Sequence, residues 1–146
     1  MAVIGAGTMG LLNAQAVRAC GARVIVTEMM EKKIKTAKVM GFEVIDAGAA
    51  DPVERVKQMT GGRGADAVIV AAGATKANEQ AAAMLKHFDG RMLMFAAAYP
   101  APELGISSND IHYRRMEILG TYLGRYKGFS GSGQTAQSES GGCQGL

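Results

Sequence analysis

Apolar and polar positions follow two alternating periods along the chain. Short runs rich in Val, Ile, Leu and Met, of strand length, are separated by longer segments with apolar residues at helical spacing. The alternation continues from residue 2 to about residue 122, as is typical of consecutive βαβ units around a parallel sheet. The predicted strands are Ala2–Gly5, Arg23–Glu28, Glu43–Asp46, Asp66–Ala71, Arg91–Phe95 and Glu117–Tyr122.

Four helices are expected between these strands. Their segments are Met9–Cys20, Glu31–Met40, a segment that opens at Asp51, and Lys76–His87. In the third, Asp51 can cap the helix, Pro52 suits its first position, and Glu54 completes a capping-box pattern. The positions at helical spacing are Leu12, Ala16, Ala19, Ile34, Ala37, Met40, Val53, Val56, Met59, Gln80, Ala81, Met84 and Leu85.

The composition fits one small domain. With 146 residues, 48% of them hydrophobic, the chain can bury a single core, and 20 Gly with no Trp indicate a core of small and branched aliphatic side chains. The predicted fold is α/β, a doubly wound parallel sheet of six strands with helices on both faces. It occupies residues 1–127. Residues 128–146 are rich in Gly, Ser and Gln without a hydrophobic period, so we expect a disordered tail.

Charge and targeting patterns exclude several classes of partner. The formal net charge is +3, but Lys and Arg are interleaved with Asp and Glu, so nucleic acid is not expected as a partner. No signal peptide or bilayer-length apolar stretch is present, which argues against a membrane partner. Cys20 and Cys143 belong to no CxxC or Cys/His cluster, which favours a cytoplasmic setting without a zinc site in this chain. Cys20 is expected to be a small buried residue.

A glycine-rich turn, Gly5-Ala6-Gly7-Thr8-Met9-Gly10, joins the first strand to the first helix. Free N–H groups and the positive end of the helix dipole converge there, where two phosphates can sit. Gly5 permits the tight turn, Gly7 lets phosphates approach the backbone, and Gly10 lets the helix pack closely on the sheet. This spacing predicts a Rossmann-type dinucleotide site.

Glu28 stands at the end of the second strand, eighteen residues after Gly10. A carboxylate there can accept the hydroxyls of an adenosine ribose and repels a 2′-phosphate, so NAD is favoured over NADP. Lys32 and Lys33 weaken that preference, because either could reach a phosphate.

Beyond these motifs, the chain resembles the zinc-type alcohol dehydrogenase branch of the medium-chain dehydrogenases, in the style of sorbitol and threonine dehydrogenases. The resemblance covers about Ala2 to Phe129 in order and spacing. It is carried by Val3–Leu12, Ala19–Ala22, Thr27–Glu28, Lys33, Ala37–Gly41, Thr60–Ile69, Ala72–Gly73, His87–Arg91 and Glu117–Thr121.

The resemblance implies three groups of cofactor-binding residues. The pyrophosphate group is Gly5, Gly7, Thr8, Met9 and Gly10. Glu28 and Lys33 are implied at the adenosine ribose, and Ala72, Gly73 and Ala97 along the nicotinamide half.

The same resemblance implies a catalytic zinc in an N-terminal domain, and this chain begins at the first predicted strand. We therefore expect that zinc domain to be absent, with no catalytic or metal-binding residue in this chain, which alone would bind NAD(H) without oxidising an alcohol. The resemblance also implies a homodimer through the edge of the sixth strand, which is exposed here. Two alternatives stay open: a non-enzymatic NAD-sensing regulatory domain and a methyltransferase.

Overall fold

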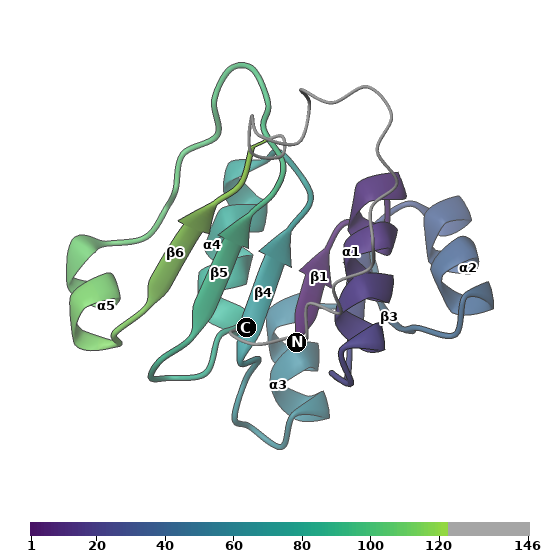
Figure 1. Cartoon of the computed structure of the whole chain (residues 1–146), viewed down its shortest axis with the longest axis horizontal. Helices are drawn as coiled ribbons and strands as arrows, with labels where there is room; N and C mark the ends of the chain where they lie inside the picture. The colour runs from purple at the N-terminus through teal and green to yellow at the C-terminus, as the bar shows by residue number, and fades with distance from the viewer. Residues whose placement is uncertain (123–146) are drawn as a thin grey trace, which may run out of the picture.

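The computed structural model describes residues 1–122, which form one parallel sheet with helices on both faces (Figure 1). The strands run in the order β3-β2-β1-β4-β5-β6. The predicted doubly wound α/β fold is confirmed. Along the chain the elements are β1 (Ala2–Ile4), α1 (Thr8–Ala19), β2 (Ile25–Glu28), α2 (Glu31–Val39), β3 (Glu43–Asp46), α3 (Pro52–Met59), β4 (Ala67–Val70), α4 (Thr75–Met84), β5 (Arg91–Met94), α5 (Ser108–Tyr113) and β6 (Glu117–Gly120).

The central strands contribute side chains to two hydrophobic cores, one on each face of the sheet. Ala2 and Ile4 pack with residues of α3 and α4, whereas Val3 packs with residues of α1 and α2. Successive side chains of a strand point to opposite faces. A strand covered on both sides must therefore be apolar at every position, which explains the unbroken apolar runs of the sequence.

The buried face of α1 differs from the predicted one. Leu11, Ala14 and Val17 are buried, whereas Leu12 is 51% exposed and Ala16 and Ala19 also lie at the surface. Both stripes have helical spacing, and the close approach of Gly10 to the end of β1 decides which one faces the sheet. The prediction of a buried Cys20 is also wrong, because this residue caps α1 on its exposed side.

Helix α4 ends at Met84 and not at His87. The chain turns to an extended conformation at Leu85, which forms a bridge with Ala65. The N–H of Ala65 donates to the Met84 carbonyl over 2.8 Å, and the N–H of Lys86 donates to the Ala65 carbonyl over 2.9 Å. Residues after Met84 therefore pair with the segment around Ala65 and do not continue the helix that their apolar spacing predicts.

Two further elements bear on the predictions. Helix α5 was not predicted from the sequence; the Ser107 side chain caps it by accepting from the N–H of Asp110. The predicted tail, 128–146, lies outside the described residues. Among residues 1–122, no helix has both the length and the apolar character needed to cross a bilayer.

The topology places the carboxyl ends of all strands at one edge. Since β1 pairs with β2 on one side and β4 on the other, the connections leave β1 and β4 in opposite directions. Such a switch point opens a crevice outside the carboxyl ends of the strands, where α/β proteins bind ligands. The glycine turn follows β1 at this point.

Candidate functional site

The turn after β1 requires a glycine at its first position. Gly5 has a φ of +99°, and its N–H donates to the Thr27 carbonyl over 2.9 Å. A Cβ at Gly5 would lie 3.1 Å from the Ala71 carbonyl oxygen and 3.5 Å from the Cβ of Ala72. The turn is therefore held between β2 and the segment that follows β4.

The other two glycines of the turn have different surroundings. A Cβ at Gly10 would collide with the Gly5 carbonyl oxygen, so α1 starts against the turn itself. A Cβ at Gly7, by contrast, would lie more than 4 Å from every other part of residues 1–122 apart from its chain neighbours and the backbone of its own helix. Gly7 is the N-cap of α1, and Thr8 and Met9 of the first turn are exposed. The N-terminus of α1 thus faces open space, as an anion-binding helix end requires.

The carboxylate of Glu28 joins the end of β2 to this turn. One oxygen accepts from the N–H of Ala6 over 2.9 Å, and the other accepts from the N–H groups of Met29 and Met30 over 2.8 and 3.0 Å. A carboxylate can accept about four hydrogen bonds. Glu28 is therefore fixed beside the glycine turn, with acceptor capacity left for a hydroxyl.

Glu28 is held in its charged form. Partial burial alone would raise the pKa of this carboxyl, but the N–H groups of Met30, Ala6 and Met29 and the charge of Lys33 outweigh burial. The pKa of Glu28 therefore lies below its ordinary value of 4.5. A fixed negative charge stands at the mouth of the site, with Lys33 half-buried on α2 beside it.

The segments after β4 and β5 meet at the same edge. The N–H of Ala71 donates to the Ile4 carbonyl over 2.9 Å, which ties the first segment to β1. A Cβ at Gly73 would lie 2.6 Å from the Cβ of Ala98 and 3.3 Å from the Ala97 carbonyl oxygen. Ala72, Gly73 and Ala97 are thus brought together next to the glycine turn.

Two polar contacts at this edge were missed in the sequence. Asn78 of α4 is buried and donates to the Glu103 carbonyl, and Thr75 accepts from the N–H of Glu103. The partners are 25 and 28 residues apart, so local patterns could not reveal them. A polar residue among the small apolar positions of α4 was the one available signal.

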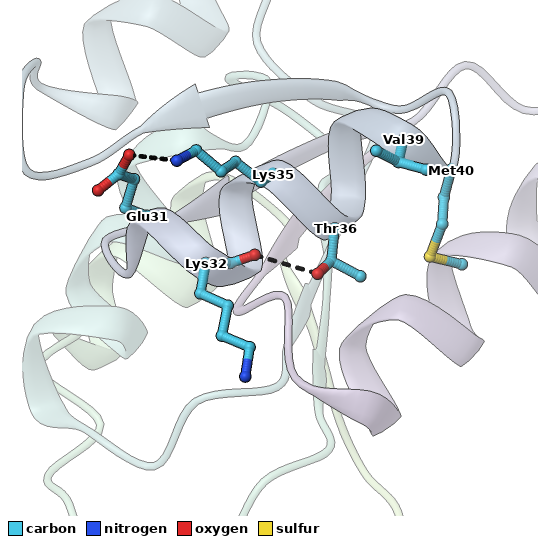
Figure 2. A pocket seen from close by; sticks show the side chains of 6 residues that line it. All are labelled: Glu31, Lys32, Lys35, Thr36, Val39 and Met40. Atoms are coloured by element: carbon cyan, nitrogen blue, oxygen red, sulfur yellow. Dashed lines mark hydrogen bonds and ion pairs between the residues drawn. The ribbon is translucent and has the colours of Figure 1, made fainter.

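A hollow elsewhere on the surface carries no comparable chemistry. It has a volume of about 510 Å³ and is lined by Glu31, Lys32, Lys35, Thr36, Val39 and Met40 (Figure 2). Three of its polar side chains are engaged within α2: Lys35 pairs with Glu31 at 2.6 Å, and the Thr36 hydroxyl donates to the backbone carbonyl of Lys32. The carboxyl edge of the sheet, where Glu28 contacts the glycine turn, remains the candidate site.

Comparisons with known proteins identify relatives over most of the chain. The model of the zinc-binding dehydrogenase family matches residues 8–137. An uncharacterised zinc-type alcohol dehydrogenase-like protein of Haemophilus influenzae is 30% identical over 82% of this chain and 34% of its own length. The sorbitol dehydrogenase of Halalkalibacterium halodurans is 30% identical over 82% of this chain and 35% of its length.

Solved structures similar to this chain also come from dehydrogenases. The alcohol dehydrogenase of Aeropyrum pernix is 26% identical, with a TM-score of 0.76 over 86% of this chain and 36% of that one. A Sinorhizobium meliloti protein described as a zinc-binding dehydrogenase, solved with NADP bound, is 28% identical, with a TM-score of 0.75 over 83% and 36% of the two chains. The chain spans about a third of the length of these relatives. The matches confirm the resemblance to zinc-type alcohol dehydrogenases that the sequence motifs indicated. It belongs to the zinc-binding dehydrogenase family and corresponds to the cofactor-binding region of these proteins.

Proposed function

We propose that this chain is the NAD(H)-binding domain of a zinc-type dehydrogenase that transfers hydride between a secondary alcohol or polyol and NAD. The observation that carries the proposal is the pairing of an open N-terminus at Gly7 with a charged Glu28 anchored to Ala6 of the same turn. Family membership favours this function over a nucleotide sensor or a methyltransferase.

The residues at the edge fit such a cofactor. The space beside Gly7 and the exposed start of α1 suit a pyrophosphate, since no side chain of residues 1–122 separates it from the backbone. In this proposal Gly5, Gly7, Thr8, Met9 and Gly10 surround the pyrophosphate. Glu28 and Lys33 bind the adenosine ribose, and Ala72, Gly73 and Ala97 line the nicotinamide half. The nicotinamide ring would carry the hydride.

NAD is proposed as the preferred cofactor because of charge. The Glu28 carboxyl is ionised at neutral pH, because its pKa lies below the ordinary value of 4.5, and an ionised carboxylate beside the ribose repels a 2′-phosphate. Lys32 is exposed and Lys33 half-buried, so both can offset part of that repulsion. The Sinorhizobium meliloti relative was solved with NADP.

We also propose that this chain alone binds the cofactor without oxidising alcohols. Residues 1–122 contain no group of three His, Cys, Asp or Glu side chains that could hold a metal ion. The side chains of these described residues therefore do not fit a catalytic zinc. Turnover of a simple secondary alcohol by the purified chain would contradict this proposal.

The proposal can be tested by titrating the purified chain with NADH, NADPH and S-adenosylmethionine, following heat release. We expect binding of NADH, weaker binding of NADPH and none of S-adenosylmethionine. Binding of S-adenosylmethionine alone would refute the proposed function. NADPH binding as tight as NADH binding would leave a dinucleotide site but remove the assigned role of Glu28.

A homodimer through β6 completes the proposal. This strand lies at the edge of the sheet, and its Leu119 is 45% exposed. An unpaired strand edge can pair with its copy across a two-fold axis. Sedimentation analysis over a range of concentrations tests this, and Leu119→Lys should shift the equilibrium toward monomer. A concentration-independent monomer would exclude the dimer.

A further inference from the structure

The loop between β5 and α5 is fastened to α4 through Glu103. The Asn78 side-chain amide donates to the Glu103 carbonyl over 2.6 Å, and the Thr75 hydroxyl accepts from the Glu103 N–H over 3.0 Å. Side chains in the first turns of α4 thus hold both backbone groups of Glu103, its carbonyl and its N–H. The loop approaches this helix again at Gly105, where a Cβ would lie 2.5 Å from the Cγ of Glu79.

Asn78 is an unusual residue for its position. It is 1% exposed, among buried Ala77, Ala81 and Ala82 of the same helix. Its Oδ1 accepts no hydrogen bond from any group within residues 1–122. Burying an unsatisfied acceptor costs free energy that an apolar side chain would not. The one hydrogen bond the Asn78 side chain makes in the described region is the one to the loop.

The beginning of the same loop lies at the candidate cofactor site. Ala97 and Ala98 pack against Gly73, and the N–H groups of Phe95 and Ala96 both donate to the Val70 carbonyl over 3.0 Å. In Figure 1 the loop rises above the arrowheads of β5 and β6 before it descends to α5. Its course is therefore fixed at two places, at Gly73 near its start and at Glu103 further along.

We propose that Asn78, assisted by Thr75, is a positioning residue for the nicotinamide half of the cofactor. It holds the loop at Glu103 and thereby keeps Ala97 and Ala98 beside Gly73. The inference rests on the proposed function, because it concerns the same dinucleotide site. Beyond that function, Asn78 and Thr75 affect the binding of the nicotinamide half of the ligand only. Both side chains lie on α4 and away from the glycine turn.

A comparison of two ligands tests this inference. NADH carries the nicotinamide ring, whereas ADP-ribose has the same adenosine and pyrophosphate without it. The measured quantity is the ratio of the dissociation constants of ADP-ribose and NADH, determined calorimetrically with the whole chain. We expect a ratio above one for the unmodified protein. Asn78→Ala and Thr75→Val should lower it by about 2- to 10-fold, the effect of one lost hydrogen bond, while ADP-ribose binding stays unchanged.

Two further variants separate positioning from general loss of structure. Asn78→Leu nearly keeps the size of the side chain but loses the donor to the Glu103 carbonyl, so it should lower the ratio as Asn78→Ala does. Gln80→Ala, on the same helix, should leave the ratio unchanged, because no side-chain hydrogen bond links Gln80 to the loop in residues 1–122. Circular dichroism establishes that each variant is folded.

The outcomes are distinct. A ratio near one in the unmodified protein, or a ratio unaffected by Asn78→Ala, overturns the positioning role. An equal loss of both ligands in Asn78→Ala also overturns it, because the effect is then not confined to the nicotinamide half. If the unmodified protein binds neither ligand, the proposed function itself fails, and this inference fails with it.

Discussion

Gly7 and Gly10 are two positions of one turn at which the same substitution is expected to affect different properties, cofactor binding at Gly7 and stability at Gly10. Alanine at Gly7 places a Cβ in open space, whereas alanine at Gly10 drives a Cβ into the Gly5 carbonyl oxygen. Gly7→Ala should therefore weaken cofactor binding and leave stability nearly unchanged. Gly10→Ala should destabilise the fold.

The magnitudes follow from the backbone and the contacts. Gly7 has φ −71° and ψ 177°, which alanine adopts without strain. A less flexible unfolded chain would favour Gly7→Ala by about 0.4–1 kcal/mol, while the poorer N-cap opposes it by a similar amount. The net change is expected within about 0.5 kcal/mol. Gly10→Ala gains about 1 kcal/mol of helix propensity, but displacing a backbone oxygen costs about 3 kcal/mol or more.

Thermal unfolding and NADH titration measure both effects. A net loss of about 2 kcal/mol in Gly10→Ala corresponds to a fall in Tm of roughly 4–8 °C for a chain of this length. Gly7→Ala should keep its Tm within about 2 °C and lose about 10- to 100-fold in NADH affinity, since charge-assisted hydrogen bonds to the pyrophosphate are obstructed. Unchanged NADH affinity in Gly7→Ala would refute the placement of the pyrophosphate. Unchanged Tm in Gly10→Ala would refute the close packing of α1.

Three further predictions concern charged groups. Glu28→Ser should lower the ratio of NADPH to NADH dissociation constants, and an unchanged ratio would remove Glu28 from the ribose site. Because the folded-state pKa of Glu28 lies below 4.5, its contribution to stability is present above that pH and is lost as pH falls through the folded value. Urea unfolding from about pH 6 to 3 should show this loss, reduced in Glu28→Gln; identical profiles would contradict it. Arg114 donates to the carbonyls of Ala82, Leu85, Lys86 and His87 at the end of α4. Arg114→Lys should cost about 1 kcal/mol in urea unfolding, whereas Asp89→Asn, which breaks an exposed ion pair, should cost less than about 0.5. Equal losses would show that the carbonyl contacts contribute little.

The strands and the start of α3 could be predicted because their signals are local. Runs of Val and Ile follow from burial on both faces, and Asp51 caps α3 by accepting from the N–H of Val53 over 2.8 Å. Even here one detail was wrong: Glu54 does not complete the capping box but lies 3.5 Å from Lys57.

The rest of the site depends on contacts between distant residues. The spacing of Glu28 from the turn predicts a ribose acid, but not its hydrogen bond to Ala6, 22 residues earlier. The buried face of α1 was similarly ambiguous, because Leu11 and Leu12 are equally apolar and only the contact of Gly10 with Gly5 selects between them. Local periodicity fixes the elements, whereas three-dimensional packing fixes their rotation and their polar partners.

The assignment of alternate β1 residues to opposite cores has a consequence for how the domain unfolds. Val3 belongs to the α1 side and Ala2 and Ile4 to the α4 side, so detaching either helix layer exposes a face of the same strand. Neither layer can melt as an independent unit, and amide hydrogens of β1 should exchange with solvent only through global opening. A ligand held at the turn that ends this strand would slow the exchange of both layers together.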